Sequence, residues 1–118
     1  MKVVPFERNG VRIVECLEVG GGASEALELI SGCMEHGAEL ALVEARHLPP
    51  EFFELRSGFA GELLQKLANY GVRLAGVFPT EAGYAERFRE FLLEAKRGRA
   101  FRAFGARADA EAWLAAGS

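Results

Sequence analysis

The sequence predicts an α/β fold in which an N-terminal β-hairpin precedes alternating helices and mainly parallel strands, about five strands and about four helices in all. Three patterns support this prediction. A tight-turn dipeptide separates two short runs near the start, two continuous apolar runs resemble strands covered on both faces, and helical apolar spacing follows each of those runs. With 118 residues and 12.8 kDa, we expect a single domain over residues 1–118.

The hairpin is expected within the first 18 residues. Asn9-Gly10 favours the positive φ angles of a primed two-residue turn, and apolar residues alternate with polar ones on both sides of it. Pro5 lacks the N–H that a ladder bond needs, so the first strand is expected at an edge of the sheet. After the glycines at 20–22, residues 23–36 predict a helix that ends at Gly37. Its expected buried face is Ala23, Leu27, Ile30 and Met34.

Residues 39–45 and 72–78 are expected to form neighbouring parallel strands, with a crossover helix over residues 57–70 between them. A further helix is expected over 81–97, a last strand over 100–104 and a short helix over 109–115. The residues expected to be nearly inaccessible to solvent are Leu42, Val43, Leu64, Leu74, Val77 and Phe88.

The composition excludes several classes of function. A net charge of -3 lacks the basic excess of a nucleic-acid binder, and no apolar run is long enough to span a membrane. The charged start of the chain is unlike a signal peptide, so we expect a cytoplasmic protein. Cys16 and Cys33 form no CxxC pattern, two histidines are present, and Asp109 is the single aspartate; no metal site, disulfide or cofactor is predicted.

Two patterns could bear chemistry. Gly20, Gly21 and Gly22 before a helix could expose backbone amides to a phosphate, but the sequence matches no phosphate-loop motif, and a slack connector explains the glycines equally. Ser57 and His47 raise the question of nucleophilic catalysis. The sequence LRSGF around Ser57 is not a nucleophile elbow, and no catalytic residue is predicted.

The aromatic residues near Ser57 indicate either core or a contact surface. Adjacent Phe52 and Phe53 point in different directions, so one can pack inward while the other, with Phe59, lines a cleft or a partly exposed surface. Further along, the stretch from Lys96 to Arg107 carries five bases and no acid. It is expected to be a solvated edge strand after a helix whose C-terminus favours cations.

The segments LPPEFFELRSGFAGELLQKL (48–67), NYGVRLA (69–75), FLLEA (91–95) and the Arg97-Gly98 stop are similar to a bacterial family without assigned activity, domain of unknown function 4180. Its order of elements resembles the STAS fold (sulfate transporter and anti-sigma-factor antagonist). In anti-sigma antagonists of that fold, the serine of a Ser-Gly pair that opens a helix is a phosphorylation switch. Ser57-Gly58 holds the corresponding place, although Leu55-Arg56 stands where an Asp is usual.

The resemblance implies a non-enzymatic regulatory or protein-interaction module of STAS-like fold. Ser57 and Gly58 are its candidate switch, with Arg56, His47, Phe52, Phe53 and Phe59 around it. The alternative is a small-molecule or lipid-binding pocket protein with weak hydrolytic activity at His47 and Ser57. Because the hairpin's edge strand and the apolar crossover segment leave surface to cover, a homodimer is also expected.

Overall fold

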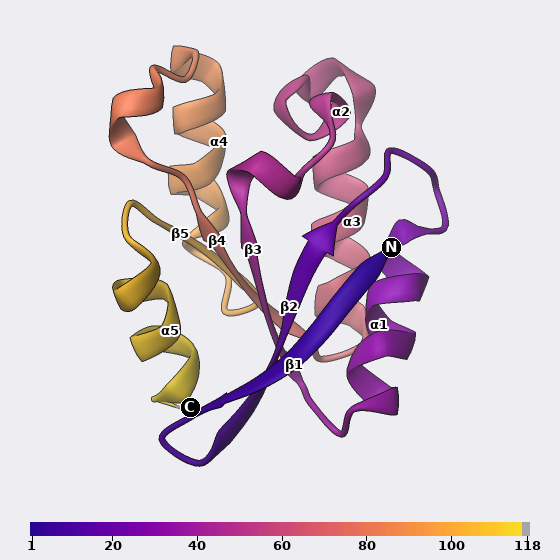
Figure 1. Cartoon of the computed structure of the whole chain (residues 1–118). Helices are drawn as coiled ribbons and strands as arrows, with labels where there is room; N and C mark the ends of the chain where they lie inside the picture. The colour runs from indigo at the N-terminus through magenta and orange to yellow at the C-terminus, as the bar shows by residue number, and fades with distance from the viewer. Residues whose placement is uncertain (117–118) are drawn as a thin grey trace.

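The computed structural model describes residues 1–116, which form one five-stranded sheet in the order β1-β2-β3-β4-β5 (Figure 1). The strands are β1 (Lys2–Arg8), β2 (Val11–Glu18), β3 (Leu40–Glu44), β4 (Arg73–Val77) and β5 (Phe101–Phe104). The helices are α1 (Glu25–Glu35), α2 (Pro50–Phe53), α3 (Phe59–Asn69), α4 (Glu86–Ala95) and α5 (Arg107–Ala115). β1 pairs antiparallel with β2 and every other pairing is parallel, which confirms the predicted fold class. The four-residue α2 was not predicted.

The hairpin forms as expected. Asn9 and Gly10 take φ angles of 54° and 78°, as a primed turn requires. β1 is an edge strand, and Pro5 lies opposite Val14 in the middle of its ladder. Pro5 has no N–H to donate, and it occupies a position of the ladder at which the backbone groups of β1 point away from β2, so no bond between the strands is lost.

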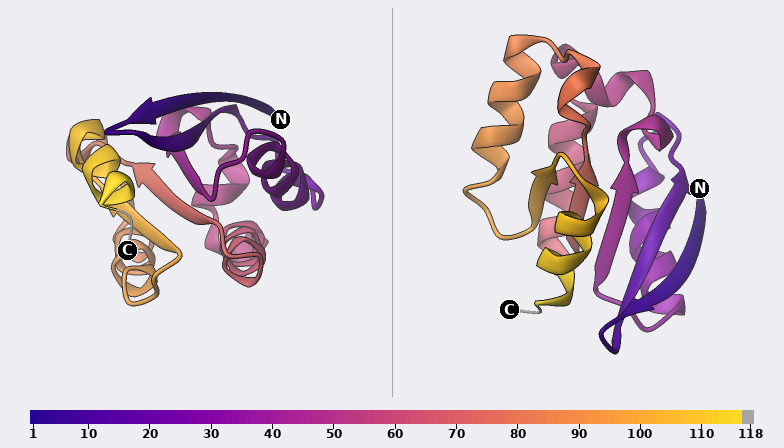
Figure 2. Two further views of the ribbon diagram at one scale, coloured as in Figure 1. Left: turned by 90° about the horizontal axis from the view of Figure 1, so that it is seen from below. Right: turned by 60° about the vertical axis from the view of Figure 1, so that its left-hand side comes forward.

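The sheet separates two apolar layers. Figure 2 shows the helices on its two faces from two further directions. α1, α3 and α4 cover one face, where Val14, Val43 and Leu74 pack against them. α5 covers the other face on the β3 to β5 side, where Leu114 packs against Leu42 and its neighbours. Crossovers that run through α1, α3 and α4 on one face are expected between neighbouring parallel strands.

The predicted buried face of α1 is wrong except at Ile30. α1 buries Ala26, Leu29, Ile30 and Cys33, whereas Leu27 and Met34 are 46% and 76% exposed and Ala23 precedes the helix. The exposed and the buried sets both have helical spacing. The buried face also contains Gly32, whose missing side chain lets α1 approach β1 closely: a Cβ on Gly32 would lie 3.0 Å from the side chain of Val3.

In α3 the buried residues are Ala60, Leu63 and Leu67, whereas Leu64, a predicted core residue, is half-buried. The other predicted core residues are confirmed as buried: Leu42, Val43, Leu74, Val77 and Phe88. α4 begins at Glu86, because residues 79–85 form a short 3-10 turn, η3 (Thr80–Ala82), and a bend at Gly83, where φ is 70°. Cys16 and Cys33 are free and buried, and burial raises the pKa of the Cys33 thiol to about 11.

Candidate functional site

The connection from β3 to α3 contains most of the predicted site residues, and it lies at the carboxyl end of the parallel strands. That end is where open α/β sheets usually bind ligands. The connection passes through two 3-10 turns, η1 (Ala45–His47) and η2 (Leu55–Ser57), with α2 between them. Pro50 fits the first turn of α2 because its missing N–H has no partner there.

Ser57 lies at the amino end of α3, and its side chain joins two segments. Its Oγ donates a hydrogen bond to the Glu51 carbonyl oxygen at 2.7 Å and accepts one from the Phe59 N–H at 3.1 Å. Gly58, between Ser57 and Phe59, has a φ angle of 75°, a conformation that favours glycine. Ser57 is exposed, so its hydroxyl can be reached from solvent, and Arg56 beside it is also exposed.

His47 and Ser57 are not joined by a hydrogen bond. The Ser57 hydroxyl proton is donated to Glu51, and the buried Nδ1 of His47 has no partner among residues 1–116. The His47 carbonyl accepts a bond from the Val19 N–H at 3.0 Å, which fixes the backbone of η1 beside β2.

A small cavity lies beside Phe59, between α3 and the start of α1. Its volume is about 10 Å³, room for one water.

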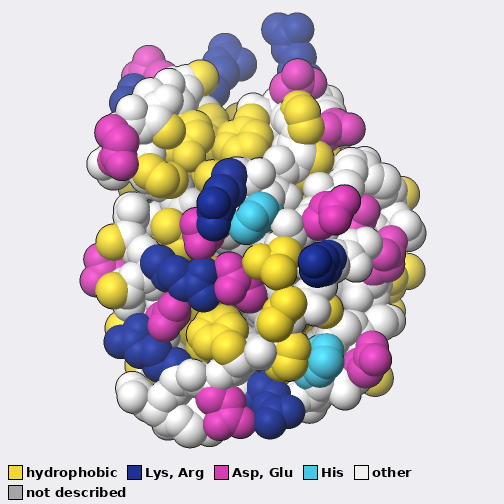
Figure 3. Space-filling model, in the orientation of Figure 1, with side chains coloured by type: hydrophobic (Ala, Val, Ile, Leu, Met, Phe, Trp, Pro, Cys, Tyr) yellow, Lys and Arg dark blue, Asp and Glu magenta, His cyan; other side chains and the backbone are white. Residues whose placement is uncertain are grey.

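The three phenylalanines have different roles. Phe52 is fully buried, and its ring packs against those of Phe78 and Phe88 with centroids 6.1 and 6.0 Å apart. The expectation that Phe52 contributes to a surface is therefore wrong. Phe53 and Phe59 are half-buried, and the ring of Phe53 stacks on Tyr84 at 5.9 Å. Figure 3 shows apolar side chains in a hollow at the top of the molecule, between α4 and the α2 segment.

The glycines at 20–22 make room for two carboxylates. A Cβ on Gly20 would collide with the Glu25 carboxylate, and one on Gly21 with that of Glu51. Two carboxylates against the loop disfavour a bound phosphate. The hydroxyl of Ser24, which precedes α1, makes no bond to the helix amides and donates a hydrogen bond to the Glu28 carboxylate at 3.3 Å.

Sequence reasoning missed a cluster around Arg107. Its guanidinium bonds to Glu15 at 2.8 and 2.9 Å, to Glu44 at 2.9 Å and to Glu111 at 2.6 Å. These bonds hold the pKa of Glu15 below its usual range and raise that of Arg107. Arg107 thus joins the start of α5 to β2 and β3, and the expectation that every base in this stretch is solvated is wrong. Two signals in the sequence could have indicated this cluster. Side chains alternate between the two faces along β2, which places Glu15 on the same face as the apolar Ile13, and Glu44 is the last residue of β3.

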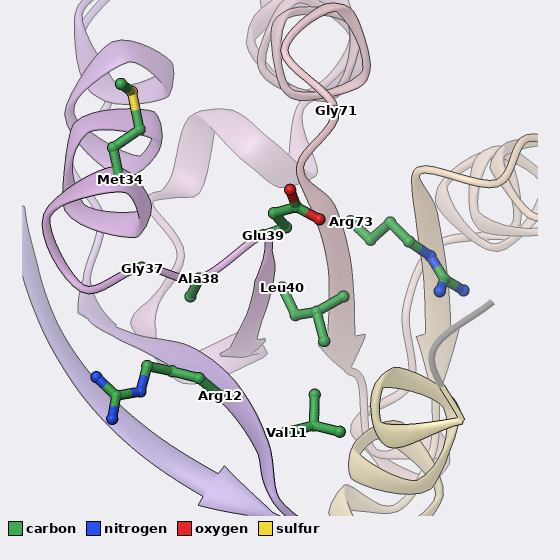
Figure 4. Close-up of a pocket in the computed structure, with 9 residues that line it drawn as sticks. All are labelled: Val11, Arg12, Met34, Gly37, Ala38, Glu39, Leu40, Gly71 and Arg73. Carbon is green, nitrogen blue, oxygen red and sulfur yellow. The ribbon is translucent and has the colours of Figure 1, made fainter.

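A second feature was also missed: an apolar groove of about 420 Å³ between α4 and β5. Its lining is Phe78, Thr80, Tyr84, Arg89, Leu92, Leu93, Lys96, Ala103, Phe104 and Gly105. A larger hollow of about 690 Å³ lies at the opposite end of the sheet, at the amino ends of the strands (Figure 4). It is an open depression, and the sticks of Met34, Arg12 and Arg73 in Figure 4 point in different directions around it.

The described residues contain no group of His, Cys, Asp and Glu side chains suited to a metal ion. Over the same residues, 1–116, no helix is long and apolar enough to cross a membrane.

An α/β domain with a five-stranded sheet and a polar, aromatic connection after β3 is the class that these observations define. The chain belongs to the family described as "Domain of unknown function (DUF4180)", which matches residues 8–114. No curated protein and no solved structure matches the chain.

Proposed function

We propose that this protein is a non-enzymatic regulatory module of STAS-like fold that binds a partner protein through the Ser57 surface, defined as Phe53, Leu55, Arg56, Ser57 and Phe59. The single observation that carries the proposal is the pair of hydrogen bonds at Ser57, which links α2 to α3 through one exposed hydroxyl. A change at that hydroxyl alters the connection between the two segments that carry the surface.

Phosphorylation of Ser57 is the proposed change. A phosphate ester has no hydroxyl proton to donate, so the 2.7 Å bond to the Glu51 carbonyl is lost. The added charge lies at the amino end of the eleven-residue α3, where backbone amides and the helix dipole stabilise it, and Arg56 is adjacent. Because Phe53 belongs to the same short helix as Glu51, release of that carbonyl changes how Phe53 is presented to a partner.

The order of elements and the Ser-Gly pair at the start of α3 support the STAS-like assignment. The buried free cysteines suit a reducing compartment, which supports a cytoplasmic location. A homodimer remains a prediction, through the apolar crossover segment rather than through β1, because Pro5 and the charged residues of β1 disfavour pairing at that edge.

The test compares partner binding by wild type, Ser57→Ala and Ser57→Glu, after phosphopeptide mapping of the protein from its native cells. Ser57→Ala also loses the bond to the Glu51 carbonyl but adds no charge, so it is expected to weaken binding less than Ser57→Glu does; it is expected to lose about 1 kcal/mol of unfolding free energy, because the Phe59 amide loses its cap. Ser57→Glu is expected to change the dissociation constant by about tenfold or more, since one unit of charge at a contact surface is worth at least about 1.4 kcal/mol. Ser31→Glu, at an exposed serine of α1, is the matched control. Equal binding by the Ser57→Ala and Ser57→Glu variants, with no phosphate found on Ser57, would reject the proposal.

A further inference from the structure

The groove between α4 and β5 is bounded on one side by an open sheet edge. β5 is the last strand of the sheet, and α4 runs beside it (Figure 2, right). Leu92 and Leu93 of α4 form one wall, and Ala103 with Phe104 of β5 forms the other. Leu93 is 67% exposed, a large fraction for a leucine that lines an apolar groove.

The backbone of β5 has groups that no other strand pairs, at the sheet edge beside this groove. The Leu74 N–H bonds to the Ala100 carbonyl and the Phe78 N–H to the Phe104 carbonyl, both at 2.7 Å. In a parallel ladder the groups that bond to a given neighbour alternate along the strand, so Arg102 also faces β4, whereas Phe101 and Ala103 face outward. No other group in residues 1–116 bonds to the N–H or C=O of Phe101 and Ala103.

The charge of the groove is positive. Arg89 and Lys96 line it, no carboxylate does, and neither cation has an ion-pair partner in the described chain. Glu81, which accepts a hydrogen bond from Thr80 at 3.4 Å, is the acid beside one end of the groove. An anion is therefore favoured along α4, at Arg89 and Lys96, and disfavoured near Thr80.

We propose that the α4–β5 groove binds an extended, acidic segment of a partner protein, which adds to the sheet as a further strand beside β5. The free groups of Phe101 and Ala103 pair with the backbone of the segment, and Leu92 and Leu93 receive its apolar side chain. This interface is separate from the Ser57 surface and does not depend on it.

The spacing of the two cations defines the sequence of the segment. Arg89 and Lys96 are seven residues apart on a helix, about 10 Å along its axis. In an extended chain, residues i and i+4 lie about 13 Å apart and share one face, with residue i+2 between them. The long side chains of Arg89 and Lys96 cover the difference. The expected motif therefore has acids at i and i+4 and a large apolar residue at i+2.

A second copy of this chain is a poor occupant. Pairing of two β5 strands would bring Arg99 and Arg102 of each copy together, next to two copies of Lys96. Like charges at such separations repel, and no acid lies between Lys96 and Arg107 to offset them.

The experiment measures binding of two fluorescein-labelled peptides, TETLTET and TKTLTKT, to the full chain by fluorescence anisotropy at low salt. TETLTET is expected to bind about tenfold or more tightly than TKTLTKT, because Arg89 and Lys96 attract its two carboxylates and repel the two lysines of TKTLTKT. Arg89→Glu with Lys96→Glu is expected to invert this preference. The matched control is Arg87→Glu with Arg97→Glu, which makes the same change of charge on α4 and just after its end, outside the groove lining, and is expected to keep the preference for TETLTET.

Ala103→Pro tests the backbone contact, since it removes an outward N–H and leaves every ladder bond to β4 in place. It is expected to weaken TETLTET binding about tenfold, whereas Glu7→Pro on β1 leaves it unchanged. Unfolding curves establish that each variant is folded. The proposal is overturned if neither peptide binds, if the charge inversion leaves the preference unchanged, or if Ala103→Pro binds as well as wild type. Decanoate that binds in place of the peptides, without dependence on the Ala103 N–H, would likewise overturn it and show a site for small amphiphiles.

Discussion

The two edge strands of the sheet, β1 and β5, differ in how accessible their outward-facing backbone N–H and C=O groups are to another chain. β1 spans seven residues and carries Pro5 at its centre, with Lys2, Glu7 and Arg8 around it. These are the features by which edge strands avoid pairing with other chains. β5 spans four residues, contains no proline, and has a groove with apolar walls beside its outward groups. The difference supports the proposal that β5, rather than β1, is the edge that receives a partner segment.

The two edges also differ in how they are attached to the core. Phe101 of β5 is 3% exposed, and its ring contacts that of Phe78 at 6.5 Å, whereas Val4 of β1 is 41% exposed. An edge strand that binds a partner segment must be held firmly by the core, because ordering a mobile β5 on binding would reduce the binding free energy.

The largest expected effect tests this attachment. Phe101→Ala removes a buried ring and is expected to lower the unfolding free energy by about 3 to 5 kcal/mol, whereas Val4→Ala on β1 is expected to cost less than about 1 kcal/mol. Urea denaturation of both variants measures the difference. Similar losses for the two would show that β5 is no better anchored than β1.

The next effect concerns α5, which covers the sheet on the β3 to β5 side and is joined to β2 and β3 through Arg107. Arg107→Leu leaves Glu15, Glu44 and Glu111 without their shared cation and is expected to cost about 1 to 3 kcal/mol at neutral pH. The expected loss is modest because the Arg107 side chain is 36% exposed. Full stability in this variant would show that the cluster is only a surface network.

The same cluster predicts a pH dependence. Because the hydrogen bonds from Arg107 lower the pKa of Glu15 in the folded protein, Glu15 stabilises the fold above its ordinary pKa of about 4.5. That contribution is lost as the pH falls through the lowered value. Acidification from pH 6 to 3 should therefore destabilise wild type more than Arg107→Leu, as thermal melts across this range can show. Parallel loss of stability in both proteins would contradict the assigned role of Arg107.

The smallest expected effect comes from opening the protected edge. Pro5→Ala restores one outward N–H on β1 and is expected to change the unfolding free energy by no more than about 0.5 kcal/mol. Its effect is expected in association, since a protected edge becomes available for pairing. Sedimentation at rising concentration measures this effect. An unchanged sedimentation profile would mean that Pro5 is not what protects β1.

The fold could be predicted largely from local signals. Asn9-Gly10 determines the hairpin, and the apolar runs determine β3 and β4, because turn chemistry and continuous burial leave few alternatives. The face of α1 could not, since Leu27 and Met34 have the same spacing as the residues that are buried. Which set faces the sheet depends on the approach of Gly32 to Val3, a contact between residues 29 positions apart.

The sites divide in the same way. The place of Ser57 at the start of α3 follows from the Ser-Gly pair, whereas its bond to Glu51 depends on the bend of the β3–α3 connection. The α4–β5 groove combines residues from Phe78 to Gly105, and only the parallel register of β4 and β5 shows which backbone groups face outward. The basic residues near β5 were visible in the sequence; the apolar walls beside them were not.

Amide hydrogen exchange at the two edges tests the central claim most directly. In the free protein, the Phe101 and Ala103 amides should exchange much faster than those of Arg102 and Phe104, which face β4. Saturating TETLTET should slow exchange at Phe101 and Ala103 and leave the outward Val3 and Glu7 amides of β1 unchanged. Exchange at Phe101 and Ala103 that is already slow without peptide, or that stays fast with it, would contradict the account.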